Sequence, residues 1–195
     1  MLHVTWEWIG LDAAALDVSN TVAVADGVEH DLLEPDSGYE RWAEAAAESP
    51  ELGHDEAAAF PAARPRVLEL REHIRKLFHA TAGGEPLPKK AVAALNEISR
   101  AAPRWPELRD DGMIEERATG DAVGRLLAAY ARSAMQIAAD GKTKLRVCGA
   151  PSCGMFFRPR RRQQLWCSIQ CGTRARVARH YRPRRASTAP VRPQV

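Results

Sequence analysis

The chain has 195 residues, 45% of them apolar, and a formal net charge of +3. This composition is that of a folded protein, and no apolar run approaches the roughly 18–20 residues that a membrane span needs. The start, MLHVTWEWIG, lacks the basic and apolar regions of a secretory signal. We therefore expect a cytoplasmic protein that contacts no membrane and keeps its thiols reduced.

The small net charge hides two segments of opposite charge. Residues 1–140 carry 14 basic and 25 acidic side chains, whereas residues 141–195 carry 14 basic side chains and no acidic one. The first segment thus has a charge of −11 and the second a charge of +14. Such an asymmetry predicts a polyanionic partner, such as a nucleic acid, for the basic segment.

Residues 1–140 predict a domain that is mainly helical and contains a minor β hairpin. Alternating apolar residues indicate a short strand over 2–8, and an Ala-rich apolar face indicates a helix over 11–24. Ser37 and Glu40 have the spacing of a capping box, which predicts the start of a second helix there.

The rest of this domain shows stronger patterns. Apolar residues recur every three or four positions in the helical stretches, and a turn dipeptide lies between two short strand-like runs. Proline before a helix, glycine after it and an Asp cap mark the helix ends. The elements so predicted are a helix over 65–80, a helix from Pro88, a hairpin over 105–117 around Asp111-Gly112, and a helix from the cap at Asp121 to Gly141.

Composition and charge both change over residues 141–144, which predicts a domain boundary. We expect an acidic helical domain over 1–140 and a second domain over 145–182. The basic tail, 183–195, has no periodic apolar face and is expected to be disordered.

All four cysteines lie in the basic segment, within 24 residues of one another. In a reducing compartment such clustering favours a metal over disulfides, and four thiolates at tetrahedral corners are typical of structural zinc. Two disulfides, buried unligated thiols, and an iron-containing or redox site are the alternatives. The predicted cofactor is therefore Zn²⁺, held in a structural role by Cys148, Cys153, Cys167 and Cys171.

The sequence around the cysteines predicts a small hairpin followed by a helix. The strands are expected over 145–147 and 155–157, the helix over 168–182, and a left-handed backbone at Gly154. Apolar burial alone cannot stabilise a module of about 40 residues, so we expect a bound metal to stabilise its fold.

Helical geometry divides the arginines that follow Cys171. Arg174 is predicted on the cysteine face, where it could offset thiolate charge, and Arg176 and Arg179 on the opposite face. Solvation of the module, or docking on the acidic domain, is the alternative to nucleic-acid contact. With four thiolates and Zn²⁺ the segment keeps a charge of about +12, which predicts steeply salt-dependent binding to phosphates. The candidate nucleic-acid contacts are Arg158, Arg160, Arg161, Arg162, Arg176, Arg179, Arg182, Arg184 and Arg185.

The stretch RVCGAPSCGMFF…LWCSIQCGTRARV resembles the CGNR-type zinc finger. Two positions depart from the signature: Thr173 stands in place of Asn, and Arg158-Pro159 replaces the Asp after the Phe strand. The resemblance implies a treble-clef-like zinc finger with four cysteine ligands, made of a β hairpin and a helix. The matching residues are Trp166, Cys167, Ser168, Cys171, Gly172, Arg174 and Arg176.

The first part of the chain is similar to the ABATE domain, the companion of that finger. The run Leu16-Asp17-Val18-Ser19-Asn20-Thr21 stands where the family has L-D-F-V-N-T, and Leu32, Leu33 and Trp42 match the element that follows. Together the two resemblances cover nearly all of residues 1–182. They imply a stress-linked bacterial transcription regulator with a mostly helical N-terminal domain.

The sequence offers little support for an enzyme. Asp17, Asn20 and Thr21 could line a small-molecule pocket, although capping and buried hydrogen bonding is the alternative that we favour. After Asp140 there is no carboxylate side chain and His180 is the one histidine, so a hydrolytic metal site lacks ligands. No Gly-rich phosphate loop, nucleophile elbow or HExxH motif is present.

These observations predict a zinc-binding transcription regulator that contacts DNA through its basic finger. Its N-terminal domain is a candidate sensor of a small-molecule effector. The alternative is a zinc-stabilised protein- or RNA-interaction module without sequence-specific DNA binding. The oligomeric state stays open.

Overall fold

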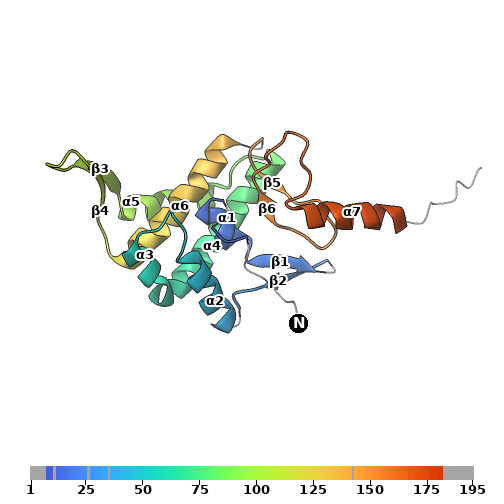
Figure 1. Cartoon of the computed structure of the whole chain (residues 1–195), viewed down its shortest axis with the longest axis horizontal. Helices are drawn as coiled ribbons and strands as arrows, with labels where there is room; N and C mark the ends of the chain where they lie inside the picture. Colours follow the sequence, from blue (N-terminus) through green and yellow to red (C-terminus); the bar gives the residue numbers. More distant parts are fainter. Residues whose placement is uncertain (1–7, 11, 26, 35, 142, 182–195) are drawn as a thin grey trace, which may run out of the picture.

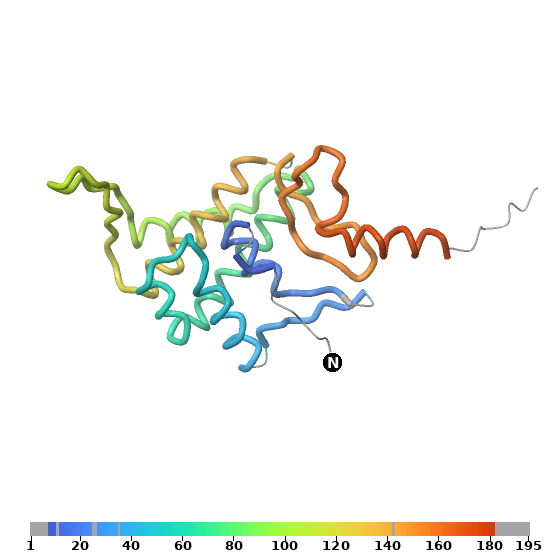
Figure 2. Tube along the Cα trace, in the orientation of Figure 1, coloured from blue at the N-terminus to red at the C-terminus, as the bar shows by residue number. Residues whose placement is uncertain are grey.

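The computed structural model describes residues 8–10, 12–25, 27–34, 36–141 and 143–181 (Figure 1). A helical body lies in the middle, the β3–β4 hairpin projects from one end and α7 from the other, as the trace in Figure 2 shows. None of the described helices is long and apolar enough to cross a membrane. The elements in chain order are α1 (Ala14–Ser19), β1 (Val22–Ala25), β2 (Val28–Asp31), α2 (Asp36–Ala46), α3 (His54–Ala58), α4 (Phe60–Gly83), α5 (Lys89–Ala101), β3 (Arg104–Leu108), β4 (Ile114–Ala118), α6 (Ala122–Asp140), β5 (Arg146–Val147), β6 (Phe156–Phe157) and α7 (Ile169–Tyr181).

The core of the body lies where α4 packs against α1, α5 and α6. Helix α4 buries Leu70, Ile74 and Phe78 at helical spacing, and α6 buries Leu126 and Tyr130. Each large apolar side chain that is fully buried contributes about 1.5–3 kcal/mol to folding. The long apolar faces recognised in the sequence are therefore the main source of the body's stability.

Aromatic side chains join α2 to this core. Trp42 is fully buried and meets the ring of Phe60 edge to face, with 5.3 Å between the ring centroids. The hydroxyl of Tyr39 donates a hydrogen bond to the carbonyl of Phe60 at 2.8 Å. These contacts fix α2 against the start of α4.

Two buried arginines of α4 hold the β1–β2 hairpin on the body. Arg71 donates to both carboxylate oxygens of Asp31, at 2.7 and 2.5 Å, and Arg75 donates to Glu29 at 2.9 Å. Paired hydrogen bonds between a guanidinium and a carboxylate are strong and directional. The hairpin therefore keeps a defined position although it pairs with no further strand in the described chain.

The predicted helix over 11–24 is wrong in extent: α1 ends at Ser19 and β1 begins at Val22. Ser19 and Thr21 donate their hydroxyls to backbone carbonyls three residues back, which closes the helix end. The β-branched residues that follow favour a strand. Of the strand predicted over 2–8, only Trp8 lies within the described residues, and it lies in a turn.

The other predicted elements of the body are present, with shifted ends. The helix over 65–80 extends to 60–83, includes Pro65, and ends at Gly84 with φ +72°. Asp121 caps α6 by accepting from the amide of Gly124. The hairpin over 105–117 is confirmed as β3–β4. The predicted capping box of Ser37 and Glu40 is wrong, because α2 already begins at Asp36 and Ser37 therefore lies inside the helix. No sequence pattern predicted helix α3.

The finger packs directly on the body. Phe156 of β6 is buried against Phe78, with ring centroids 5.5 Å apart, and Leu145 joins the same core. The side chain of Asn20 accepts from the amide of Phe156 at 2.7 Å and donates to its carbonyl at 2.9 Å. The finger thus shares the core of the body through Leu145 and Phe156 and has a small core of its own around Cys148, Phe157 and Cys171.

We predict that Asn20→Ala lowers the free energy of unfolding by about 2–4 kcal/mol, because it leaves a buried peptide group without its partners. Urea denaturation of the full-length protein measures the change. Gln163→Ala, which removes an exposed amide from the finger, is the control and should shift stability by less than about 0.5 kcal/mol. Equal stabilities for the two variants would contradict the proposed importance of this contact.

Candidate metal centre

The first cysteine pair lies at the end of the β5–β6 hairpin. Cys148 follows β5, and its amide donates to the carbonyl of Met155 at 2.9 Å, which folds the loop back on itself. The left-handed residue of this loop is Ser152, with φ +54°, and not Gly154 as predicted. Glycine is required at position 154 for a different reason, because a Cβ there would lie 2.7 Å from Cγ2 of Val24. Glycine thus allows β1 to approach the loop.

The second pair lies at the start of α7. The side-chain oxygen of Ser168 accepts from the amide of Cys171 at 3.1 Å and so caps the first turn. A Cβ on Gly172 would lie 3.4 Å from the indole of Trp166. This is ordinary van der Waals contact, so the indole packs directly against this turn of α7, beside the two cysteines.

The four sulfur atoms converge within 4.8 Å of one another. The Sγ atoms of Cys153 and Cys167 are 3.8 Å apart, and those of Cys167 and Cys171 are 3.5 Å apart. A tetrahedral zinc with bonds of about 2.3 Å requires sulfur–sulfur distances of about 3.8 Å. The residues present thus fit a zinc ion held by four thiolates. No histidine or carboxylate of the described chain belongs to this cluster, so every ligand is a cysteine sulfur.

Four thiols this close cannot all ionise on their own. Hydrogen bonds from the thiols of Cys153 and Cys167 lower the pKa of Cys148 to about 2. The hydrogen bond to Cys148 in turn raises the pKa of Cys153 to about 12, and Cys148 and Cys153 raise the pKa of Cys167 still further. A divalent cation offsets this repulsion, which is what zinc would contribute.

Arg174 lies beside the cluster. Its Nη2 donates to Sγ of Cys171 at 3.1 Å, and the amide of Cys167 donates to Sγ of Cys148 at 3.3 Å. Donors directed at thiolates disperse their negative charge and hold their orientation. The structure thus places Arg174 on the cysteine side of α7.

The sequence did not single out Arg146, although it organises the loop between the cysteine pairs. Its guanidinium donates to the carbonyls of Gln164 and Arg162, at 2.7 and 2.6 Å. A lone arginine in the strand before Cys148 was the available signal. This bracing leaves the side chains of Arg160, Arg161 and Arg162 exposed on the loop.

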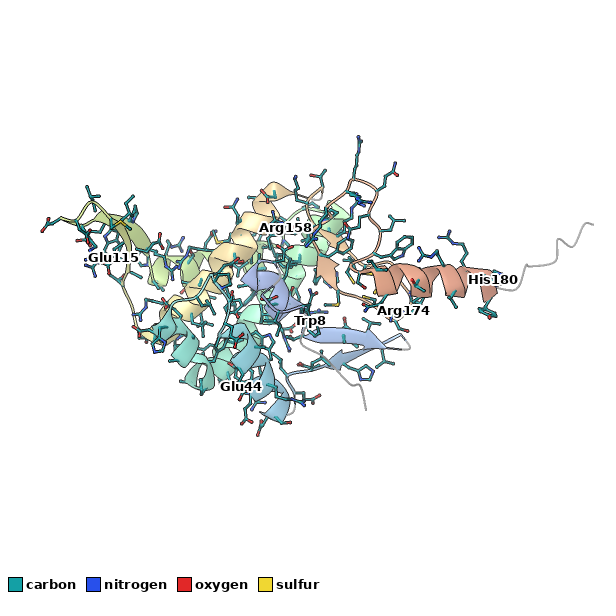
Figure 3. All side chains as sticks on the ribbon, in the orientation of Figure 1. Trp8, Glu44, Glu115, Arg158, Arg174 and His180 are labelled. Atoms are coloured by element: carbon teal, nitrogen blue, oxygen red, sulfur yellow. The ribbon has the colours of Figure 1, made fainter. Side chains whose placement is uncertain are left out.

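Two of the predicted nucleic-acid contacts lie elsewhere than expected. Arg158 points back to the body and pairs with Asp12 and Asp140, at 3.5 and 3.4 Å, which is the docking alternative (Figure 3). Arg179 lines a groove together with Ala178 of α7 and His79 of α4, so it lies on the flank of α7 and not directly opposite the cysteines. Arg176 is exposed and donates to the hydroxyl of Thr173. The predicted contacts Arg182, Arg184 and Arg185 lie outside the described residues.

The three polar residues of the candidate ligand pocket are engaged with protein groups. Asn20 holds the Phe156 peptide group, and Thr21 donates to the carbonyl of Val18 at 2.7 Å. Asp17 is buried and accepts from the amide of Gly10 at 3.0 Å. These contacts match the alternative of capping and buried hydrogen bonding.

Burial raises the pKa of Asp17 from 3.8 to about 7, with Glu51 adding to the rise. The unfolded chain therefore loses this proton at a lower pH than the folded one. Stability contributed by the neutral carboxyl is present below pH 4 and is lost as the pH rises to about 7. We predict that Asp17→Asn is close to wild type near pH 4 and more stable by up to about 4 kcal/mol above pH 7. Urea denaturation as a function of pH tests this, and a pH-independent difference would contradict it.

We predict one zinc per chain and its loss in Cys167→Ser, because three thiolates hold the ion much less tightly than four. Metal analysis after dialysis measures the content. Far-UV circular dichroism should keep most of the helical signal, which comes from the body. Thr173→Ala, next to the ligands in sequence but exposed, is the control and should retain zinc. Full zinc occupancy in the cysteine variant would contradict the site.

Comparison with known proteins agrees with this architecture. Residues 12–141 match the family model ABATE, described as "Putative stress-induced transcription regulator". Residues 144–185 match the CGNR zinc finger model. A search of curated proteins found no match. Since the first model spans well over half of the chain and the second covers the cysteine cluster, the chain belongs to the ABATE family and carries a CGNR zinc finger at its C-terminal side.

Proposed function

We propose that this zinc-binding regulator contacts DNA through helix α7 and the loop between its cysteine pairs. The observation that carries the proposal is the shape and charge of α7. Its 13 residues make a rod about 20 Å long, of which only Cys171 and Gly172 are buried. The helix projects from the body (Figure 1), and the major groove, about 12 Å wide, admits a single helix.

The outer side of α7 carries side chains suited to base edges. Arg176 can donate two hydrogen bonds to guanine, and apolar side chains can contact the thymine methyl group. Ile169 is 87% exposed and Val177 is 50% exposed, which leaves both available. The residues that share this side by helical spacing are Ile169, Thr173, Arg176, Val177 and His180.

The loop between the cysteine pairs adds candidates for phosphate contact. Arg160, Arg161 and Arg162 are exposed and precede the helix in sequence, and residues 141–195 contain no acidic side chain. The acidic end of the molecule lies away from them: Figure 3 shows Glu115 and His180 at opposite ends of the long axis. This separation keeps the β3–β4 hairpin away from a duplex bound at α7.

A binding role is also favoured over an enzymatic one. The four cysteine ligands leave no coordination position for water, and the finger offers no carboxylate that could act as a base. The exposed apolar residues of α7 are the observation that favours the second candidate, a protein or RNA partner. Binding to a DNA duplex weakens steeply with salt, and the following experiment measures this dependence.

We predict that Arg176→Glu weakens binding to a short random-sequence duplex by about tenfold or more at low salt. It should also reduce the slope of log affinity against log salt by about 1, since one phosphate or base contact is lost. Fluorescence anisotropy across a salt series measures both quantities.

Arg109→Glu is the matched control for this experiment. It makes the same charge change on the turn of the β3–β4 hairpin, at the other end of the molecule, and should leave the affinity within about twofold. Equal losses of duplex affinity in the two variants would show that the change of net charge alone causes the effect. A wild-type protein that binds no duplex at low salt would overturn the proposal and leave the protein or RNA candidate.

A further inference from the structure

A groove of about 1080 Å³ lies between the end of α4 and the inner side of α7. Helix α4 contributes His79 and Gly83, and strand β5 contributes Arg146. The opposite wall is formed by Ala178 and Arg179 of α7. Both family regions therefore line this open groove, which is large enough to take a small molecule.

One wall of the groove is apolar and open to solvent. Val147 is 38% exposed and Leu165 is 54% exposed, and both line the groove together with Trp166. Exposed apolar side chains that line a concave surface favour an occupant with an apolar body. The indole adds a planar face on which a ring can stack.

The charges that line the groove are positive. Arg146 uses two of its nitrogens on loop carbonyls, whereas Arg179 has no hydrogen bond or ion pair to any residue in the described part of the chain. Burial lowers the pKa of His79, so at pH 7 it offers a hydrogen bond without a charge. The described lining residues include no Asp or Glu. Glu85 lies near Gly83, at the α4 end.

We propose that this groove binds a small organic anion with a flat apolar body, such as an aromatic carboxylate or sulfonate. The anionic group would pair with Arg179, and the ring would lie against Trp166 and Leu165. Such a ligand touches both α4 and α7, so it would connect the body to the helix that we propose for DNA. Only this consequence rests on the proposed function, because the site itself needs no DNA.

A nucleotide of a DNA strand has the same chemistry, a phosphate beside a flat ring. Arg176 and Arg179 are neighbours three residues apart on α7, but of the two only Arg179 lines the groove, so they serve two adjoining surfaces of the same helix. If the occupant is a free small molecule, the two surfaces are used at the same time. If it is a nucleotide of bound DNA, the two ligands compete.

The test uses the zinc-loaded full chain and the fluorescent probe 8-anilinonaphthalene-1-sulfonate, an aromatic anion. We expect saturable binding of one probe per chain, weakened at least fivefold by Arg179→Gln. Arg176→Gln, on the outer side of the same helix, should leave the probe affinity within about twofold. N-phenyl-1-naphthylamine has the same rings without the sulfonate, and its binding should be insensitive to Arg179→Gln. Zinc content checks that each variant is intact.

Three outcomes would overturn the proposal. The first is probe binding that Arg179→Gln leaves unchanged, and the second is an equal effect of Arg176→Gln. The third is stoichiometric displacement of the probe by a duplex, which would make the groove part of a nucleic-acid interface. Because the titration contains no DNA, a protein that binds the probe but no duplex would refute the proposed function and leave this site in place.

Discussion

The pairing of the Asn20 side chain with the peptide group of Phe156 determines how the two parts of the molecule lie relative to one another. An amide side chain offers one donor and one acceptor in the arrangement of a neighbouring peptide group, so Asn20 replaces the strand that β6 lacks on that side. The Phe156 ring then fills the space beside Phe78, with the guanidinium of Arg75 6.0 Å from its centre. The loop that holds Cys153 lies directly before Phe156 in sequence, so this contact helps to fix the position of the metal ligands.

What the sequence predicts well is what depends on neighbours along the chain. The zinc ligands lie within one short segment, and apolar residues that recur at helical spacing indicate the long buried faces of α4 and α6. The role of Asn20 could not be found in this way, because its partner, the Phe156 peptide group, lies 136 residues away. Arg179 was misplaced for a similar reason. A helical wheel gives angles between residues of one helix, but the side that meets α4 depends on how the finger docks.

The opposite charges of the two segments are kept apart rather than neutralised. Arg158 is the described finger residue that bridges them by ion pairs, through Asp12 and Asp140. The acidic β3–β4 hairpin lies at the other end of the long axis (Figure 3). Since exposed charges are screened beyond about 10 Å at moderate salt, each end presents its own potential to a partner. The low net charge therefore says little about how either end behaves.

The two buried residues of helix α7, Cys171 and Gly172, lie in its first turn, and Ala175 of the next turn packs against the same cysteine cluster. The helix is thus a rigid rod fixed at one end, and its pivot coincides with the metal cluster. A tilt of about 10° at that turn would displace the far end of a rod about 20 Å long by about 3–4 Å, close to the rise of one base pair. Because α7 begins at the cysteine cluster, any change in the geometry of the sulfur ligands would move the far end of the helix most, so the angle of the helix is what the cluster would control.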